Sequence, residues 1–121
     1  FIFIDRQPAE RIPELLCACD AAFISFMNNP LFEKTIPAKL QSYMACGMPI
    51  LASASGETKR IIEEAKCGIC CEIGDVDKLS KGISKIKDSK LEEEKSKSTE
   101  YTNVHFNRAK LFDFVEKEMN L

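Results

Sequence analysis

Short apolar runs alternate with amphipathic stretches along most of the chain. Apolar runs bounded by polar turns, proline or glycine are typical of strands. Four of them predict strands at residues 1–4 (FIFI), 21–27 (AAFISFM), 49–53 (PILAS) and 67–73 (CGICCEI). The second run has apolar residues on both of its alternating faces, which favours a strand that is covered on both sides.

Between these runs, apolar residues recur three and four positions apart, as on one face of a helix. The stripes of four predicted helices are Ile12, Leu15, Leu16 and Cys19; Leu40, Tyr43 and Met44; Ile61, Ile62 and Ala65; and Leu79, Ile83 and Ile86. Pro37 would open the second helix and Gly47 would end it. The third helix would stop near Gly68, and Asp75 would cap the fourth. Strands alternating with helices predict an α/β fold with a parallel sheet.

The C-terminal third of the chain has a different pattern. Residues 87–100 (KDSKLEEEKSKSTE) are charged and nearly free of apolar side chains, which predicts either a solvated helix surface or a linker. Asn107 can then cap a last helix, whose apolar stripe would be Phe112, Val115 and Met119.

Length and composition are those of a small globular protein and argue against a nucleic-acid-binding or membrane-spanning one. A chain of 121 residues holds one small domain, and 45% hydrophobic with 30% charged residues is ordinary for a globular protein. The net charge of −2 gives no strong field, so no nucleic-acid partner is expected. No apolar run approaches the roughly 20 residues of a membrane span. Because the chain starts without Met and inside a predicted strand, we expect a piece of a longer protein.

Six cysteines raise the alternative of a zinc or redox protein. Cys67 and Cys70 have C-x-x-C spacing, but neither a second such pair nor paired histidines complete four ligands. We therefore expect no metal, and we interpret the cysteines as buried free thiols in a reducing cytoplasm. Metal analysis of the purified protein would decide between the two interpretations.

The candidate chemistry lies where a predicted strand leads into the helix that starts at Pro37. Ligands of open parallel sheets bind beyond the carboxyl ends of the strands, and a helix N-terminus attracts phosphate through its unpaired N–H groups. Lys39 adds a positive charge within one turn, and Ser42 shares its face of the helix. This arrangement suits a diphosphate followed by a ribose. The same side chains also fit a solvated helix face, and Glu33 alone fits a surface carboxylate.

The segment PAKLQSYMACGMPILASASGETKRIIEEAKCGICCEIGDVDKL resembles the C-terminal, nucleotide-sugar-binding domain of group-1 retaining glycosyltransferases with the GT-B architecture. The resemblance implies an incomplete Rossmann-like domain over residues 1–86, with a charged linker and a C-terminal helix of the same domain over residues 87–121. It also implies transfer of a sugar from a nucleoside-diphosphate-sugar, expected to be a UDP-sugar, to an acceptor hydroxyl. The expected pathway is cell-surface polysaccharide or glycolipid synthesis, in the cytoplasm or at the inner face of the membrane.

The same resemblance implies roles for individual residues. Glu33 would be the catalytic carboxylate beside the sugar, with no metal and no cofactor. The donor-binding residues would be Lys34, Thr35, Ile36, Pro37, Ala38, Lys39 and Ser42. Many relatives carry two glutamates eight residues apart. Here Ser42 stands at the second of these positions and Lys34 at the first, with Glu33 one residue off.

The resemblance further implies two upstream strands and an N-terminal acceptor domain, which we expect to lie outside this sequence. In the usual strand order, 3-2-1-4-5-6, those strands lie in the middle of the sheet. We therefore expect the isolated chain to associate through an open sheet edge and not to turn over substrate. A non-catalytic donor-binding subunit that needs a partner chain is the alternative. Other doubly wound proteins fit less well, because only Asp5 follows the first run and no G-x-G-x-x-G turn exists.

Overall fold

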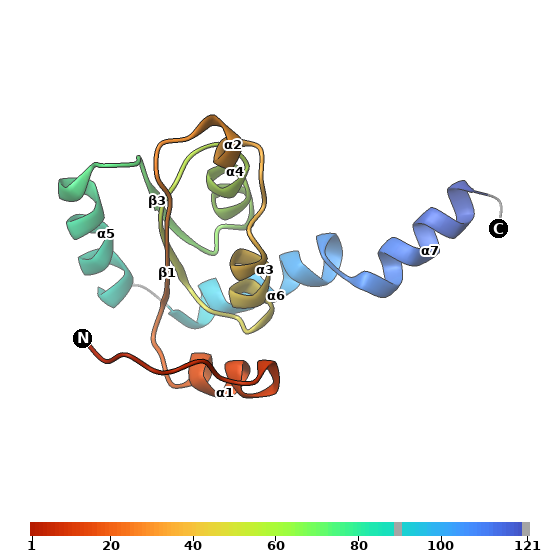
Figure 1. Cartoon of the computed structure of the whole chain (residues 1–121), viewed down its shortest axis with the longest axis horizontal. Helices are drawn as coiled ribbons and strands as arrows, with labels where there is room; N and C mark the ends of the chain where they lie inside the picture. The colour runs from red at the N-terminus through yellow and green to blue at the C-terminus, as the bar shows by residue number, and fades with distance from the viewer. Residues whose placement is uncertain (89–90, 120–121) are drawn as a thin grey trace.

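The computed structural model describes residues 1–88 and 91–119. Helices pack on both faces of a small sheet, and the last helix projects from the rest of the molecule (Figure 1). In chain order the elements are η1 Ala9–Arg11, α1 Ile12–Cys17, β1 Ala22–Ser25, α2 Pro30–Glu33, α3 Ala38–Ala45, β2 Ile50–Ser53, α4 Gly56–Ala65, β3 Gly68–Cys71, α5 Val76–Asp88, α6 Leu91–His105 and α7 Arg108–Glu118.

The three strands form one parallel sheet in the order β1-β2-β3. Ile50 in β2 pairs with Ala22 on one side and with Gly68 on the other. The predicted α/β fold with a parallel sheet is confirmed. Gly68 begins β3, within the strand predicted at residues 67–73. A Cβ there would overlap the backbone of Ile50, so the close approach of β2 requires glycine at this position. Helix α4 ends at Ala65, and Lys66 follows it in the left-handed conformation.

The strand predicted at residues 1–4 is wrong. These four residues lie outside helices and strands, and their exposed fractions range from 61% at Ile4 to 119% at Phe1. A strand is stable only when a neighbouring strand accepts and donates its backbone hydrogen bonds. In the described residues β1 is an edge of the sheet, and residues 1–4 pair with no strand there.

One face of the sheet carries the core. Helices α3 and α4 pack against it, and α6 packs against α3 and α4. Leu40 and Met44 of α3 are fully buried there, as their helical spacing predicts, and Gly47 follows α3 with a positive φ of 68°. The cluster of buried residues is Ile24, Leu40, Met44, Ile50, Ala52, Ala54, Ile61, Ile62, Ala65 and Cys67. This core anchors α3 and α4, the two helices that follow β1 and β2.

The other face is covered by α5, which packs on β2 and β3. Helix α5 does not cover β1. Ile24 of this strand points into the core, while Phe23, on the other face, is 52% exposed. The prediction that β1 is covered on both sides is therefore wrong for the described residues. Asp75 caps α5 as predicted, by accepting a hydrogen bond from the Lys78 N–H at 2.9 Å. Ile86 is buried, but Ile83 is 57% exposed because it faces the uncovered side of β1.

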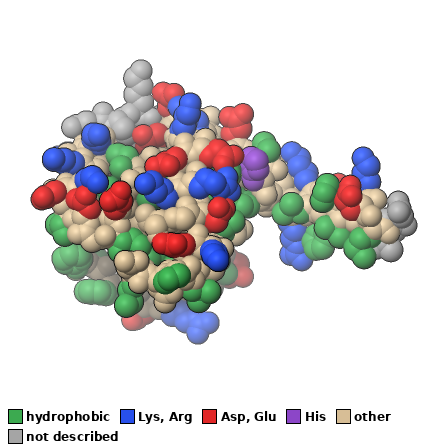
Figure 2. All heavy atoms as spheres, turned by 90° about the horizontal axis from the view of Figure 1, so that it is seen from above, with side chains coloured by type: hydrophobic (Ala, Val, Ile, Leu, Met, Phe, Trp, Pro, Cys, Tyr) green, Lys and Arg blue, Asp and Glu red, His purple; other side chains and the backbone are tan. Residues whose placement is uncertain are grey.

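The charged C-terminal stretch is helical where the structure describes it. Residues 89–90 of that stretch lie outside the described residues. Helix α6 lies against α3, and Ser98 is fully buried between them. Asn107 caps α7 as predicted, accepting from the Lys110 N–H at 3.2 Å. The α7 stripe contacts no core: Phe112, Val115 and Met119 are exposed on the projecting helix (Figures 1 and 2).

Candidate functional site

The candidate site lies on the segments that follow β1 and β2. The chain leaves β1, forms α2 above α4, and returns without regular structure to the start of α3 (Figure 1). Figure 2 views the molecule from the side of α2, where the parallel strands end, and shows acidic and basic side chains intermingled on that face. Any preference for an anion must therefore arise locally, from particular N–H groups and side chains.

Helix α2 is short and is held by contacts on three sides. Asn29 caps it by accepting a hydrogen bond from the Leu31 N–H at 2.9 Å. The ring of Phe32 stacks on that of Phe26, with centroids 5.3 Å apart and planes 17° apart. The backbone of Glu33 lies directly against Gly56, the first residue of α4. The Glu33 side chain is exposed, so its carboxylate is available to a ligand.

The segment between α2 and α3 contains four of the predicted donor-binding residues, Lys34 to Pro37. Lys34 ends α2, and the Thr35 hydroxyl donates to the Phe32 carbonyl at 3.3 Å. Ile36 is 38% exposed. Pro37 is the N-cap of α3 rather than its first residue, with φ −70° and ψ 140°. Since proline has no N–H, the first donors of the helix belong to Ala38 and Lys39.

The start of α3 is open to solvent. The Leu40 N–H donates to the Pro37 carbonyl at 3.0 Å, whereas the N–H groups of Ala38 and Lys39 have no acceptor among the described residues. Both residues are exposed. The Lys39 side chain has no ion pair with any residue that the structure describes. Two unpaired N–H groups and one unpaired ammonium group therefore lie within one helical turn.

Ser42 lies one turn further along α3 and is exposed. Its hydroxyl donates to the Ala38 carbonyl of the same helix at 3.1 Å. The hydrogen is thus already bonded, and the oxygen lone pairs remain to accept a hydrogen bond from a ligand hydroxyl. A carboxylate at this position would bind a ribose more strongly, because hydrogen bonds to charged acceptors are stronger.

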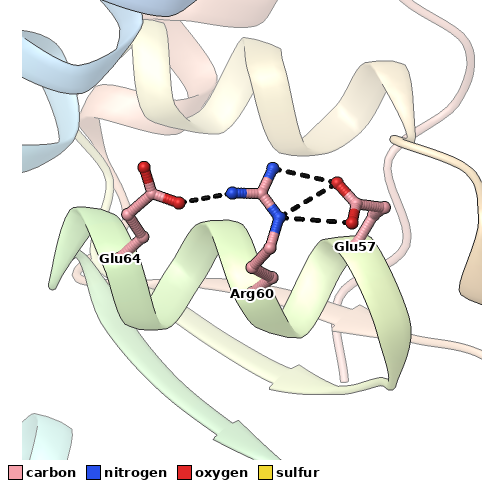
Figure 3. A network of polar contacts seen from close by, with 3 residues as sticks. All are labelled: Glu57, Arg60 and Glu64. Atoms are coloured by element: carbon pink, nitrogen blue, oxygen red, sulfur yellow. Dashed lines mark hydrogen bonds and ion pairs between the residues drawn. The ribbon is translucent and has the colours of Figure 1, made fainter.

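Arg60, a cation on α4, is already neutralised by neighbouring carboxylates. Its guanidinium bonds both carboxylate oxygens of Glu57, at distances from 2.9 to 3.2 Å, and also bonds Glu64 (Figure 3). The Arg60 hydrogen bonds hold the pKa of the Glu57 carboxyl below its usual range. With two carboxylates on one guanidinium, this cluster carries a net negative charge. Arg60 is therefore less available to a phosphate than Lys39, which has no ion pair among the described residues.

The predicted residues lie along α2, the segment after it and α3, and among them the Ser42 hydroxyl contacts the Ala38 carbonyl. Glu33 sits on α2 against α4, and no hydrogen bond or ion pair joins it to Lys39 within the described residues. The close contact between Glu33 and Gly56 escaped the sequence analysis. In the sequence, Gly56 directly precedes Glu57 at the predicted start of a helix, but this pattern also fits an ordinary helix start and does not indicate the contact.

Other candidate chemistry lies elsewhere. An apolar hollow of about 370 Å³ lies between β1, β2 and α5, on the opposite side of the sheet, and is lined by Phe23, Leu51 and Ile83 among others. Its apolar walls do not suit a nucleotide. All six cysteines are free, but Cys17 and Cys19 are exposed, so the interpretation as buried thiols is wrong for these two. Burial raises the pKa of the Cys67 and Cys70 thiols to about 11. No group of three or more metal-ligating side chains occurs in residues 1–88 and 91–119.

Comparison with known proteins gives the family. The family described as "Glycosyl transferases group 1" matches residues 1–103, which is most of the chain. The chain belongs to this family, and its parallel sheet with flanking helices represents part of the Rossmann-like domain. Members in general use a nucleotide-sugar donor. No curated protein and no solved structure matches the chain at the threshold of the comparison. No helix in the described part of the chain is long and apolar enough to cross a membrane.

Proposed function

We propose that the start of α3 binds the diphosphate of a nucleoside-diphosphate-sugar, and that this chain supplies the donor-binding part of a glycosyltransferase. One observation carries the proposal: the exposed N–H groups of Ala38 and Lys39 have no acceptor among the described residues, and the free Lys39 ammonium lies beside them. Helix N-termini favour anions through these donors and through the helix dipole. A doubly charged diphosphate is therefore a better fit to this surface than a neutral ligand.

The proposed reaction moves a glycosyl group to an acceptor hydroxyl. The bond between the anomeric carbon and the β-phosphate oxygen breaks, and its electron pair leaves with the diphosphate. The acceptor oxygen bonds to the anomeric carbon, and its proton passes to the released diphosphate or to water. Lys39 and the two N–H groups would stabilise the charge that develops on the leaving group. Stabilisation of this kind requires no metal ion.

The remaining residues have narrower proposed roles. Glu33, exposed at the end of α2, would lie beside the donor sugar, and the Ser42 oxygen would accept a hydrogen bond from the ribose. Lys34, Thr35 and Ile36 would line the path between them. A UDP-sugar donor, an acceptor in cell-surface polysaccharide or glycolipid synthesis, and a cytoplasmic or inner-membrane-face location belong to the same proposal. Their support is the sequence resemblance together with membership of the family.

A calorimetric titration of the 121-residue chain with UDP, GDP and ADP tests the proposal. We expect at least one nucleoside diphosphate to bind, and Lys39→Ala to weaken that binding about tenfold. Lys117→Ala is the matched control, since Lys117 is an exposed lysine near the end of α7, and it should leave binding unchanged. Equal binding by the unchanged chain and the Lys39→Ala variant would remove Lys39 from the site.

A donor-binding subunit without its own catalysis is the second candidate. The observation that favours it is Lys34, which stands where the resemblance places the first glutamate, so that the nearest carboxylate, Glu33, lies one residue away. Mixing the chain with candidate acceptor domains and measuring sugar transfer distinguishes the two. Transfer that depends on a second chain and persists in Glu33→Gln would favour the subunit.

A further inference from the structure

The backbone of Glu33, in α2, lies close to Gly56, the first residue of α4. A Cβ atom on Gly56 would overlap the carbonyl oxygen of Glu33 and would lie only 2.5 Å from its carbonyl carbon and Cα. Gly56 also has a φ of 61°, in the region that favours glycine. A side chain at position 56 can therefore be accommodated only if α2 or the start of α4 moves.

The length and burial of the two helices indicate which of them would move. Helix α4 is ten residues long and buries Thr58, Ile61, Ile62 and Ala65. Helix α2 is four residues long and buries none of its residues. Such a short helix has little stability of its own, so its position depends on its tertiary contacts. When the two are pushed apart, α2 is the element that gives way.

The start of α3 would not follow this movement. Leu40 and Met44 of α3 are fully buried in the core, and four residues without helical structure separate α2 from Ala38. These residues absorb a shift of α2 before it reaches the N–H groups of Ala38 and Lys39. A substitution at Gly56 should thus move Glu33 and leave the diphosphate site at the start of α3 in place.

We infer that Gly56 is a positioning residue, which places Glu33 at the correct distance from the donor diphosphate by letting the α2 backbone lie directly on α4. The inference rests on the proposed function, because it assigns Glu33 to the sugar and α3 to the diphosphate. Gly56 itself touches neither. Replacing Gly56 should therefore change how the sugar contributes to binding and leave binding of the diphosphate unchanged. A glycine needed only for stability would not affect the sugar alone.

The test compares the binding of UDP with that of UDP-N-acetylglucosamine. In the unchanged chain we expect the sugar to alter affinity at least fivefold relative to UDP. Gly56→Ala should abolish this difference and leave UDP affinity within twofold. Gly74→Ala is the matched control: Gly74 has a φ of 86°, so the backbone strain is similar, but a Cβ there meets nothing within 4 Å. The Gly74→Ala variant should therefore keep the difference in affinity between UDP and UDP-N-acetylglucosamine.

Backbone amide NMR of the same proteins provides a readout that needs no ligand. Gly56→Ala should shift the amide signals of residues 31–34 and leave those of Ala38 and Lys39 in place. Asn29→Ala removes the cap of α2 without touching α4, and should give the same effects in weaker form. This second variant decides the question if Gly56→Ala does not fold.

Each outcome has one meaning. If the unchanged chain binds no nucleoside diphosphate, the proposed function fails, whereas the NMR comparison still reports on the contact. If UDP binds but the sugar adds nothing, or if Gly56→Ala behaves like the unchanged chain, the positioning role is overturned. Equal loss of UDP and UDP-sugar binding in folded Gly56→Ala would also overturn it, because α3 would then have moved as well.

Discussion

Ser98 and Met44, 54 residues apart in the sequence, are joined by a hydrogen bond inside the protein: the Ser98 hydroxyl donates to the Met44 carbonyl at 3.3 Å. Both residues are fully buried. The bond ties α6, from the charged C-terminal stretch, to the helix whose N-terminus forms the candidate site. The position of α3 therefore depends on residues that follow the sheet by some distance in the chain.

Replacement of Ser98 by alanine should lower the free energy of unfolding by about 1 kcal/mol, because a buried carbonyl loses one hydrogen-bond donor. Ser98→Leu should lower it further, by about 1–3 kcal/mol, since the added atoms have no space between α3 and α6. Urea denaturation followed by circular dichroism measures both changes. Ser96→Ala, at an exposed position of the same helix, should stay within about 0.5 kcal/mol.

Lys66 ends α4 with a φ of 51° and a ψ of 38°, a left-handed conformation that costs a non-glycine residue about 1–2 kcal/mol. Lys66→Gly removes this strain and adds freedom to the unfolded chain, so we expect a net gain of about 0.5–1 kcal/mol. Lys59→Gly, within the same helix, should instead cost about 1 kcal/mol. Loss of stability in both variants would show that Lys66 is not strained.

Asp75 couples the stability of α5 to pH. Its carboxylate accepts a hydrogen bond from the Lys78 N–H and pairs with the Lys78 ammonium at 3.0 Å, and these interactions lower the pKa of the Asp75 carboxyl. A lowered pKa in the folded state contributes stability above the unfolded pKa, near about 4, and that contribution is lost as the pH falls further.

Replacement by asparagine separates capping from charge at this position. Asp75→Asn should remain capped, since asparagine is an equally good N-cap, but should lose less stability than the unchanged chain between about pH 5 and pH 2. Asp75→Ala should be less stable already at pH 7. Thermal unfolding at a series of pH values measures the three curves, and parallel curves for the unchanged chain and the Asp75→Asn variant would contradict the assignment.

Some parts of the fold follow directly from the sequence, because the pattern of apolar residues there indicates a single structure. The spacing of Leu40 and Met44, followed by Gly47, predicts a buried helix with a glycine end, and both are present. Likewise, the strand β2, apolar except for Ser53, is buried along its whole length. In these elements local pattern and tertiary packing agree.

Other parts depend on partners that the local pattern cannot specify. The run at residues 1–4 has strand composition but no adjacent strand among the described residues, and the α7 stripe has helical spacing but no surface to cover there. Conversely, the polar stretch around Ser98 is packed against α3, which its composition does not reveal. The contact between Glu33 and Gly56 depends on backbone positions alone, so the pattern of side chains in the sequence does not predict it.

The central claim is that the first N–H groups of α3 bind a diphosphate, and the backbone amide signals of Ala38 and Lys39 test it most directly. On titration with UDP, these two signals should move more than those of any other helix start, and uridine, which has no phosphate, should leave them in place. Signals at Ala38 and Lys39 that stay unchanged while UDP binds would contradict the account.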